Sequence, residues 1–203
     1  MTLNKNTIKI QNTKTLFLSL VGVGTLYFSQ VAVAVPVELK MTNQRQELNQ
    51  CVPTSASMML SSKGWDYPPR QIKLLSLNKP YYGPTTPFNY FTVTNYTQLQ
   101  TALNQIGQKW TSVSFKNDAL GFDAGLNKIK DSINRGYPVL IGITICRGVG
   151  HAVVIKGYDD DKKYVIVGDP GDGQTKQWTY AELQNRWNML FTFINLRSCM
   201  FMF

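Results

Sequence analysis

Two apolar stretches joined by a short polar turn constrain the fold of this chain more than any other feature. Residues 151–156 and 164–167 are rich in Val and Ile, and G-Y-D-D-D-K-K lies between them. Two such runs around a polar turn predict a β-hairpin. Because hairpin strands are antiparallel, the end of the second strand returns beside the start of the first.

Further elements are predicted on both sides of this hairpin. Apolar spacing and flanking Gly or Pro predict helices over residues 53–63, 70–77, 97–106, 122–135 and 179–187. Strands are predicted over residues 109–115, 138–145 and 190–196. Residues 35–50 read as an extended polar lead-in. Sequential strands with short connections favour an antiparallel sheet, so the expected fold class is α+β.

The first 34 residues have the pattern of a secretory signal peptide. Three lysines precede a mostly apolar run, and Ala32-Val33-Ala34 gives a small-x-small cleavage pattern. Ser, Thr and Gln interrupt the run, which falls short of the roughly 20 apolar residues of a membrane span. We expect an exported protein, secreted or periplasmic. Residues 35–203 would form one domain, with no stable membrane span after cleavage.

The numbers of Cys and His exclude several classes of site. The 203-residue chain has three Cys and one His. A disulfide-rich scaffold needs more cysteines. A closed zinc site would consume all four of these side chains. Chemistry that needs two histidines is excluded, and we expect no metal or organic cofactor.

The basic charge of the chain is spread over its length. The formal net charge is +9, yet no basic run exceeds two residues. Nucleic-acid binding favours clustered basic residues with interleaved aromatics. We therefore expect no nucleic-acid partner, and the scattered lysines also disfavour a protein that only binds an anionic envelope.

Cys51 is the candidate nucleophile. It stands immediately before the helix predicted over residues 53–63. Unpaired N–H groups and the positive end of the helix dipole favour a thiolate there. An ordinary buried cysteine is the alternative.

His151 and Asp169 are the candidate base and orienting acid. His151 begins a strand after Gly148 and Gly150, and it is the only general base of this type in the chain. Asp169 ends the second hairpin strand, so the hairpin brings it near His151, where a carboxylate can orient the imidazole. A core histidine and a turn aspartate bonded to its own backbone are the alternatives.

Other polar residues leave alternatives open. Gln44, Gln46 and Gln50 precede Cys51, and each could donate a side-chain N–H to an oxyanion. Cys146 and Cys199 could pair as a disulfide in an oxidising compartment or remain free thiols.

The chain also carries four segments in a particular order: Q-x-x-x-x-C-x-P-T-S-A-S-M, G-Y-P-V-L-I-G-I, G-H-A-V-V-I-K-G-Y-D and V-G-D-P-G-D-G. Together they resemble papain-like cysteine peptidases. More narrowly, they are similar to the bacteriocin-leader-processing peptidase family and its stand-alone relatives, over about residues 40–196.

The resemblance implies a papain-like fold, with Cys51 on an N-terminal helix and His151 and Asp169 on an antiparallel sheet. It implies a cysteine peptidase that cleaves peptide or protein substrates, and we expect a monomer. Gln46 is our choice for the oxyanion donor, with Gln44 second. Three features depart from the family: Val52 stands where it usually has Gly, the upstream Gln fits at more than one spacing, and no transporter segment follows. The resemblance therefore does not imply transporter-coupled leader cleavage.

Two other functions compete with peptide hydrolysis. A same-fold enzyme could transfer the acyl group or cleave an isopeptide or peptidoglycan amide bond, although the usual cell-wall pattern has a second His. A non-catalytic binding module could retain the scaffold, which the presence of Cys51, His151 and Asp169 disfavours.

Overall fold

The predicted hairpin lies within an antiparallel sheet in the computed structural model, which describes residues 35–87, 92–146, 149–187 and 196–202. The strands are β1 (Val37–Glu38), β2 (Trp110–Lys116), β3 (Val139–Cys146), β4 (Val149–Asp159), β5 (Tyr164–Asp169), β6 (Gln174–Thr179) and β7 (Leu196–Met202). Neighbours follow the order β2-β7-β3-β4-β5-β6, and β1 pairs with β4. All pairs are antiparallel.

Five helices accompany the sheet in the described residues: α1 (Cys51–Ser61), α2 (Pro69–Ser76), α3 (Tyr96–Gln105), α4 (Ala119–Asn134) and α5 (Tyr180–Arg186). Each coincides with a predicted helix, within a few residues at the ends. The main shift is at α1, which begins at Cys51 itself rather than at residue 53. The α+β class is confirmed.

Two parts of the sheet differ from the prediction. The strand predicted over residues 190–196 lies outside the described residues except at Leu196, where β7 begins and runs on to Met202. Strand β6 was not predicted, because its polar residues face solvent at a sheet edge and only Trp178 is buried. The predicted signal peptide, residues 1–34, also lies outside the described residues.

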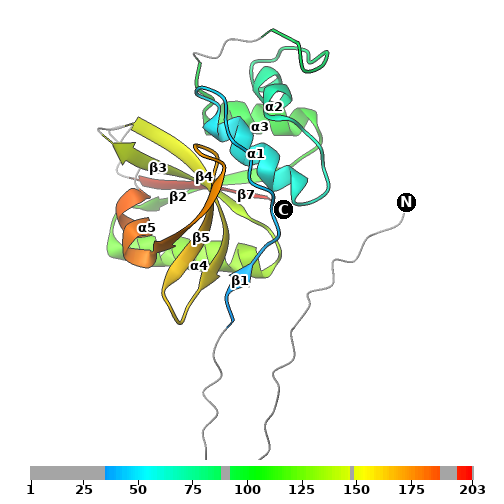
Figure 1. The fold of residues 1–203 in the computed structure, drawn as a ribbon. Helices are drawn as coiled ribbons and strands as arrows, with labels where there is room; N and C mark the ends of the chain where they lie inside the picture. The colour runs from blue at the N-terminus through cyan, green and yellow to red at the C-terminus, as the bar shows by residue number, and fades with distance from the viewer. Residues whose placement is uncertain (1–34, 88–91, 147–148, 188–195, 203) are drawn as a thin grey trace, which may run out of the picture. The chain divides into compact units, whose positions relative to one another are not determined.

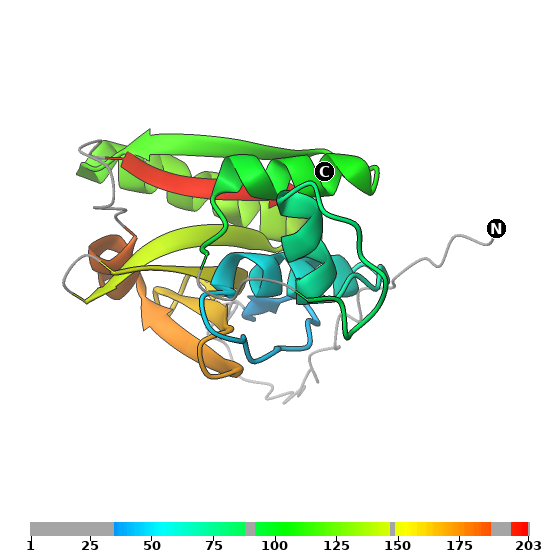
Figure 2. The ribbon, with the colours of Figure 1, turned by 90° about the horizontal axis from the view of Figure 1, so that it is seen from above.

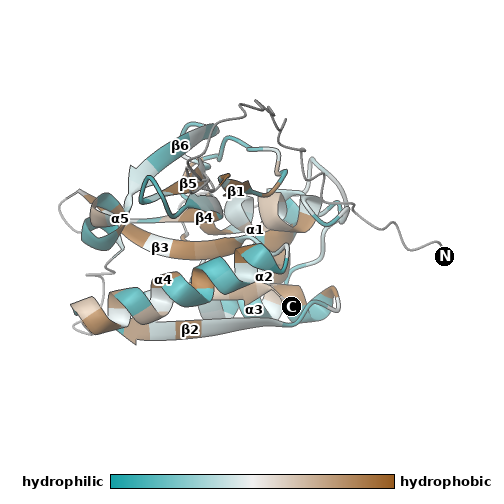
Figure 3. Cartoon of the chain, turned by 90° about the horizontal axis from the view of Figure 1, so that it is seen from below, coloured by the Kyte–Doolittle hydropathy of each residue, from teal (hydrophilic) through white to brown (hydrophobic). Residues whose placement is uncertain are grey.

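Helices cover both faces of the sheet. One core contains buried residues of α1, α2 and α3 with Leu140, Ala152 and Val154 of the sheet. The other contains α4 and α5 with the alternate residues of the same strands, such as Ile141 and Val153. Figure 1 shows α1, α2 and α3 gathered on one side and α4 along the other. Figure 3 shows apolar colour along β3 and β4 and polar colour on the outer side of α4.

The lead-in segment ties β1 to α1 along the edge of the hairpin. The N–H of Leu39 donates to the carbonyl of Lys156 at 2.8 Å, and the N–H of Gln46 donates to the carbonyl of Pro170 at 2.7 Å. Figure 2 shows this blue segment passing beside the turn between β5 and β6. The residues directly before Cys51 are therefore held against the turn that follows Asp169.

Strand register excludes the disulfide that Cys146 and Cys199 could have formed. Cys199 pairs with Ile141 across β7 and β3. Cys146 is five residues farther along β3, or about 17 Å at about 3.4 Å per residue, whereas a disulfide joins Cα atoms roughly 4.4–6.8 Å apart. Cys199 is a buried free thiol whose sulfur lies 3.5 Å from the carbonyl of Val113. Burial raises the pKa of this thiol far above its usual range.

None of the helices in the described ranges is long and apolar enough to cross a membrane.

Candidate active site

Helix α1 places the sulfur of Cys51 at its positive end. Cys51 is the first residue of the helix, the preceding Gln50 makes no side-chain cap, and the first turn contains no acid. The N–H groups of Cys51 and Val52 therefore have no partner within the helix, while Pro53 has no N–H to offer. Unfilled donors and the helix dipole both stabilise a negative charge on the sulfur.

Packing against β4 sets the position of this helix end. The hydroxyl of Ser55 donates to the carbonyl of Ala152 at 3.3 Å. Ser55 is one helical turn after Cys51, on the same side of α1, and Ala152 is the neighbour of His151 on β4. The helix thus brings Cys51 to the strand residue that carries the imidazole, and Cys51 is one of the groups that raise the pKa of His151.

Strand register brings His151 to Asp169. Val154 pairs with Gly168, so Asp169, the next residue of β5, lies beside Val153. His151 is two residues from Val153 and is therefore a diagonal neighbour of Asp169 on the same face of the sheet. Its Nε2 lies 2.6 Å from Oδ1 of Asp169, and the two side chains retain exposures of only 9% and 10%. Because Nε2 faces the carboxylate, Nδ1 is the nitrogen available to the thiol.

The charge on His151 follows from these contacts. Burial, the largest single influence, lowers its pKa because a low-dielectric interior disfavours the imidazolium. The hydrogen bonds and negative charges of Asp169 and Cys51 together outweigh burial and raise the pKa from 6.5 to about 9. Since the folded pKa is higher, this interaction stabilises the folded state below about pH 6.5 and is lost as the pH rises through about 9.

Asp169 is an anion held by three donors. Burial alone would raise its pKa, but hydrogen bonds from His151, Lys176 and the N–H of Gly171 hold the pKa well below its usual range. The ammonium of Lys176 lies 2.6 Å from Oδ2, and the N–H of Gly171 lies 2.8 Å from Oδ1. The carboxylate therefore stays ionised and fixed in orientation at neutral pH.

The three candidate glutamines have different surroundings. Gln44 exchanges hydrogen bonds with the hydroxyl of Ser57, and Gln50 donates to the carbonyl of Leu48. In the described part of the chain, Oε1 of Gln46 is buried without a hydrogen-bond partner. Gln46 also lies beside the turn after Asp169 through its backbone. Oε1 of Gln50 is likewise unpartnered, so Gln46 differs from the other two in that its Nε2 makes no hydrogen bond among the described residues.

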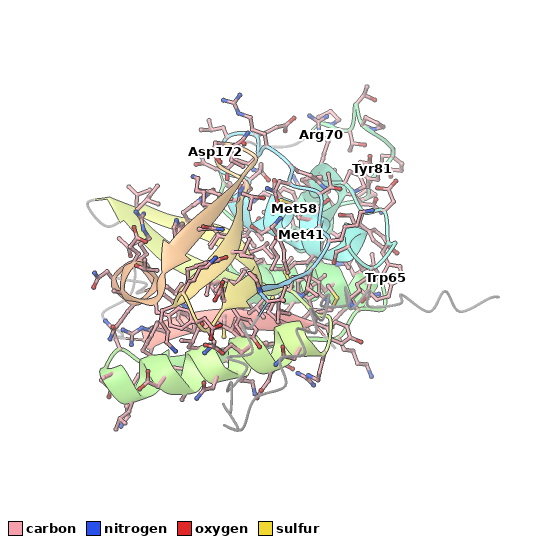
Figure 4. All side chains as sticks on the ribbon, turned by 60° about the horizontal axis from the view of Figure 1, so that its bottom comes forward. Met41, Met58, Trp65, Arg70, Tyr81 and Asp172 are labelled. Carbon is pink, nitrogen blue, oxygen red and sulfur yellow. The ribbon has the colours of Figure 1, made fainter. Side chains whose placement is uncertain are left out.

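A cleft of about 410 Å³ opens beside the N-terminal end of α1. It is lined by Gln44, Arg45, Glu47, Gln50, Thr54, Pro68, Pro69, Arg70, Tyr81 and Pro84. Figure 4 shows Arg70 and Tyr81 on the helical side and Asp172 on the turn after β5. The cleft reaches Gln50, the residue before Cys51, while Cys51, His151 and Asp169 are not among the residues that line it.

Lys176 and Gly171 are contributors that the sequence analysis missed. A Cβ on Gly171 would lie 3.1 Å from Oδ1 of Asp169 and 3.4 Å from Nε2 of His151, so the residue leaves room for their contact. The alternating pattern of residues 174–179 was the available signal for Lys176, because a strand there lies next to β5. Among the described residues, no group of three His, Cys, Asp or Glu side chains could hold a metal ion.

A solved structure shares this architecture: the peptidase domain of Streptococcus ComA, a bi-functional ABC transporter involved in a quorum sensing pathway. Its TM-score is 0.57, with 15% identity over 81% of this chain and 97% of that domain, and a likeness at this identity establishes the fold alone. Xylellain, a cysteine protease from Xylella fastidiosa, is a more distant match, with a TM-score of 0.47 and 11% identity over 84% of this chain and 86% of that one. No curated protein matches the sequence.

The fold is that of the papain-like cysteine peptidases. The chain itself belongs to the Peptidase_C39 like family, whose profile matches residues 34–192. It is therefore a cysteine-type peptidase, and the family implies peptide substrates. The resemblance seen in the sequence is confirmed at the level of fold, family and enzyme class.

The single imidazole allows a direct test of the site's charge. In untagged protein, the Cε1–H signal of His151 in an NMR titration should have a midpoint near pH 9. Asp169→Asn removes a negative charge and should move the midpoint down toward 6.5. Asp123→Asn, the same change on an exposed part of α4, should leave it unchanged. A midpoint near 6.5 in the unaltered protein would contradict the ion pair.

Proposed function

We propose that this protein hydrolyses peptide bonds through a Cys51-His151-Asp169 triad and that it acts after export. The observation that carries the proposal is the position of His151. Its Nε2 is 2.6 Å from Asp169, and Cys51 at the N-terminus of α1 is near enough to raise the pKa of its imidazole. Acyl transfer requires a nucleophile beside a base, and a carboxylate that orients the base.

The acylation step starts from a Cys51 thiolate beside the imidazolium of His151, whose raised pKa keeps it protonated at neutral pH. The Cys51 thiolate attacks the carbonyl carbon of the substrate, and a C–S bond forms as the carbonyl oxygen becomes an oxyanion. The imidazolium of His151 then gives its proton to the leaving amine, and the C–N bond breaks. Asp169 keeps the imidazole in the orientation and tautomer that this transfer needs.

The deacylation step restores the same ion pair. Neutral His151 takes a proton from water, and the hydroxide attacks the thioester carbon. The C–S bond breaks, the product carboxylic acid leaves, and sulfur departs as thiolate beside the new imidazolium. No group outside the chain and water is needed for this cycle.

Gln46 is our proposed oxyanion donor. The backbone N–H of Cys51 supplies one donor, and a side-chain amide beside it supplies the second. Gln44 and Gln50 already use their amides within the protein, whereas Gln46 has no side-chain hydrogen bond within the described ranges. An uncommitted amide needs no rearrangement to receive the developing charge.

We further propose that the substrate lies in the cleft beside α1. Gln50, the residue before Cys51, is among the residues that line it. A peptide in the cleft would therefore have its backbone close to the N-terminus of α1.

Peptide cleavage can be tested without knowing the natural substrate. A proteome-derived peptide library is digested with residues 35–203, and new N-termini are identified by mass spectrometry. Cys51→Ala should remove them, and Asp169→Asn should slow their formation by about 10²–10⁴, as in other triads. New termini of equal yield with Cys51→Ala would overturn the proposal. Bound but uncleaved peptides would favour the binding module instead.

Replacement of the glutamines tests the oxyanion assignment. Gln46→Ala should lower kcat on a peptide identified in that digest by about 10²–10³, the usual effect of losing one oxyanion donor. Gln44→Ala and Gln50→Ala make the same chemical change at matched positions and should cost much less. A larger loss for either of these than for Gln46→Ala would transfer the role to that residue.

Export is proposed from the sequence pattern of residues 1–34. Intact-mass analysis of protein recovered outside the cytoplasm of its host should show a chain that begins at Val35. Ala34→Leu should block processing because a small residue is required at this site, while Val33→Leu should be processed normally. Cytoplasmic protein that retains Met1 in every variant would contradict export.

A further inference from the structure

Lys176 joins two carboxylates beside the proposed catalytic pair. Its ammonium lies 2.6 Å from Oδ2 of Asp169 and 2.8 Å from Oδ2 of Asp172. Asp169 uses its other oxygen for His151. The chain of contacts Asp172, Lys176, Asp169, His151 therefore alternates in charge from the turn after β5 to the imidazole.

The sheet builds this chain of contacts across three adjacent strands. Gln174 of β6 pairs with Asp169 of β5, and Lys176 lies two residues farther along β6 on the same face. Lys176 is thus a diagonal neighbour of Asp169, as His151 is from the β4 side. Strand register, rather than a flexible loop, fixes the cation behind the carboxylate.

We propose that Lys176 is a positioning residue that acts through Asp169 to limit how strongly His151 holds its proton. The proposal rests on the proposed function, because it concerns proton transfer by the triad. A carboxylate without a second cation would bind the imidazolium more tightly. Lys176 partly neutralises the charge of this carboxylate and so weakens its hold on the imidazolium. The imidazolium can therefore still release its proton to a leaving amine.

Other charged groups surround His151 and Asp169, and the substitution that tests the proposal leaves them unchanged. They are Cys51 on α1, Arg45 beside Gly173 in the turn after β5, Asp172 in the same turn, and buried Lys73 on α2, which interacts electrostatically with Cys51. Only Lys176 donates from its side chain to Asp169 besides His151 in the described part of the chain. A change at Lys176 therefore reaches His151 through one carboxylate.

The decisive measurement is the NMR titration of His151 in Lys176→Met. Removal of the cation should raise the midpoint by about one pH unit, the lower end of the effect of a neighbouring charge, because Lys176 is 35% exposed. Lys176→Arg keeps the charge and should restore the original midpoint. Lys162→Met, on the exposed turn between β4 and β5, is the matched loss of one lysine and should have no effect.

Kinetics gives a second readout where hydrolysis is observed. The alkaline limb of kcat/KM in Lys176→Met should move upward with the imidazole midpoint, since that limb reports deprotonation in the free enzyme. An unchanged midpoint, with or without a loss of thermal stability, would reduce Lys176 to a structural role and overturn the proposal. A lower midpoint would also overturn it, because Asp169 would then have left the imidazole. The titration needs no turnover, so a protein without peptidase activity would refute the proposed function and leave this test intact.

Discussion

The pairing of β4 with β5 is the interaction on which the candidate site depends. Its register makes His151 and Asp169 diagonal neighbours, and the turn that follows β5 receives the lead-in segment through the carbonyl of Pro170. The other side of β4 receives α1 through the carbonyl of Ala152. This hairpin therefore carries both the base and the acid. It also positions the helix of the nucleophile and the segment that contains the glutamines, both of which come from a distant part of the chain.

The site keeps charged groups in a largely buried place by pairing each with an opposite charge. An isolated buried carboxylate or imidazolium would carry a large desolvation penalty. His151 offsets the charge of Asp169 on one side and Lys176 offsets it on the other. Lys176 and Asp172, the charged groups farthest from His151, are partly exposed and can be solvated by water. Such pairing gives the imidazole a fixed orientation as well as a fixed charge.

The thiol lies at the start of a helix that is otherwise almost entirely buried. Residues from Val52 to Leu60 are buried, which anchors α1 firmly in the core. Val52 stands where related peptidases usually have Gly, and here it packs into the core shared with β4. The replacement of Gly by Val at this position therefore affects the packing of α1 next to the thiol. The cleft lined by Gln50 and Thr54 lies beside this end of the helix.

The sequence by itself determined the five helices, the α+β class and the closeness of His151 to Asp169. Periodicity and turn chemistry are local signals, and a hairpin brings its two ends together whatever the rest of the chain does. Tertiary structure alone decided three further points: the separation of Cys146 from Cys199, the free amide of Gln46 among three candidate glutamines, and the place of Lys176 behind Asp169. Each depends on register or packing between segments that are distant in sequence. An exposed edge strand such as β6 also has few apolar residues from which a strand could be predicted.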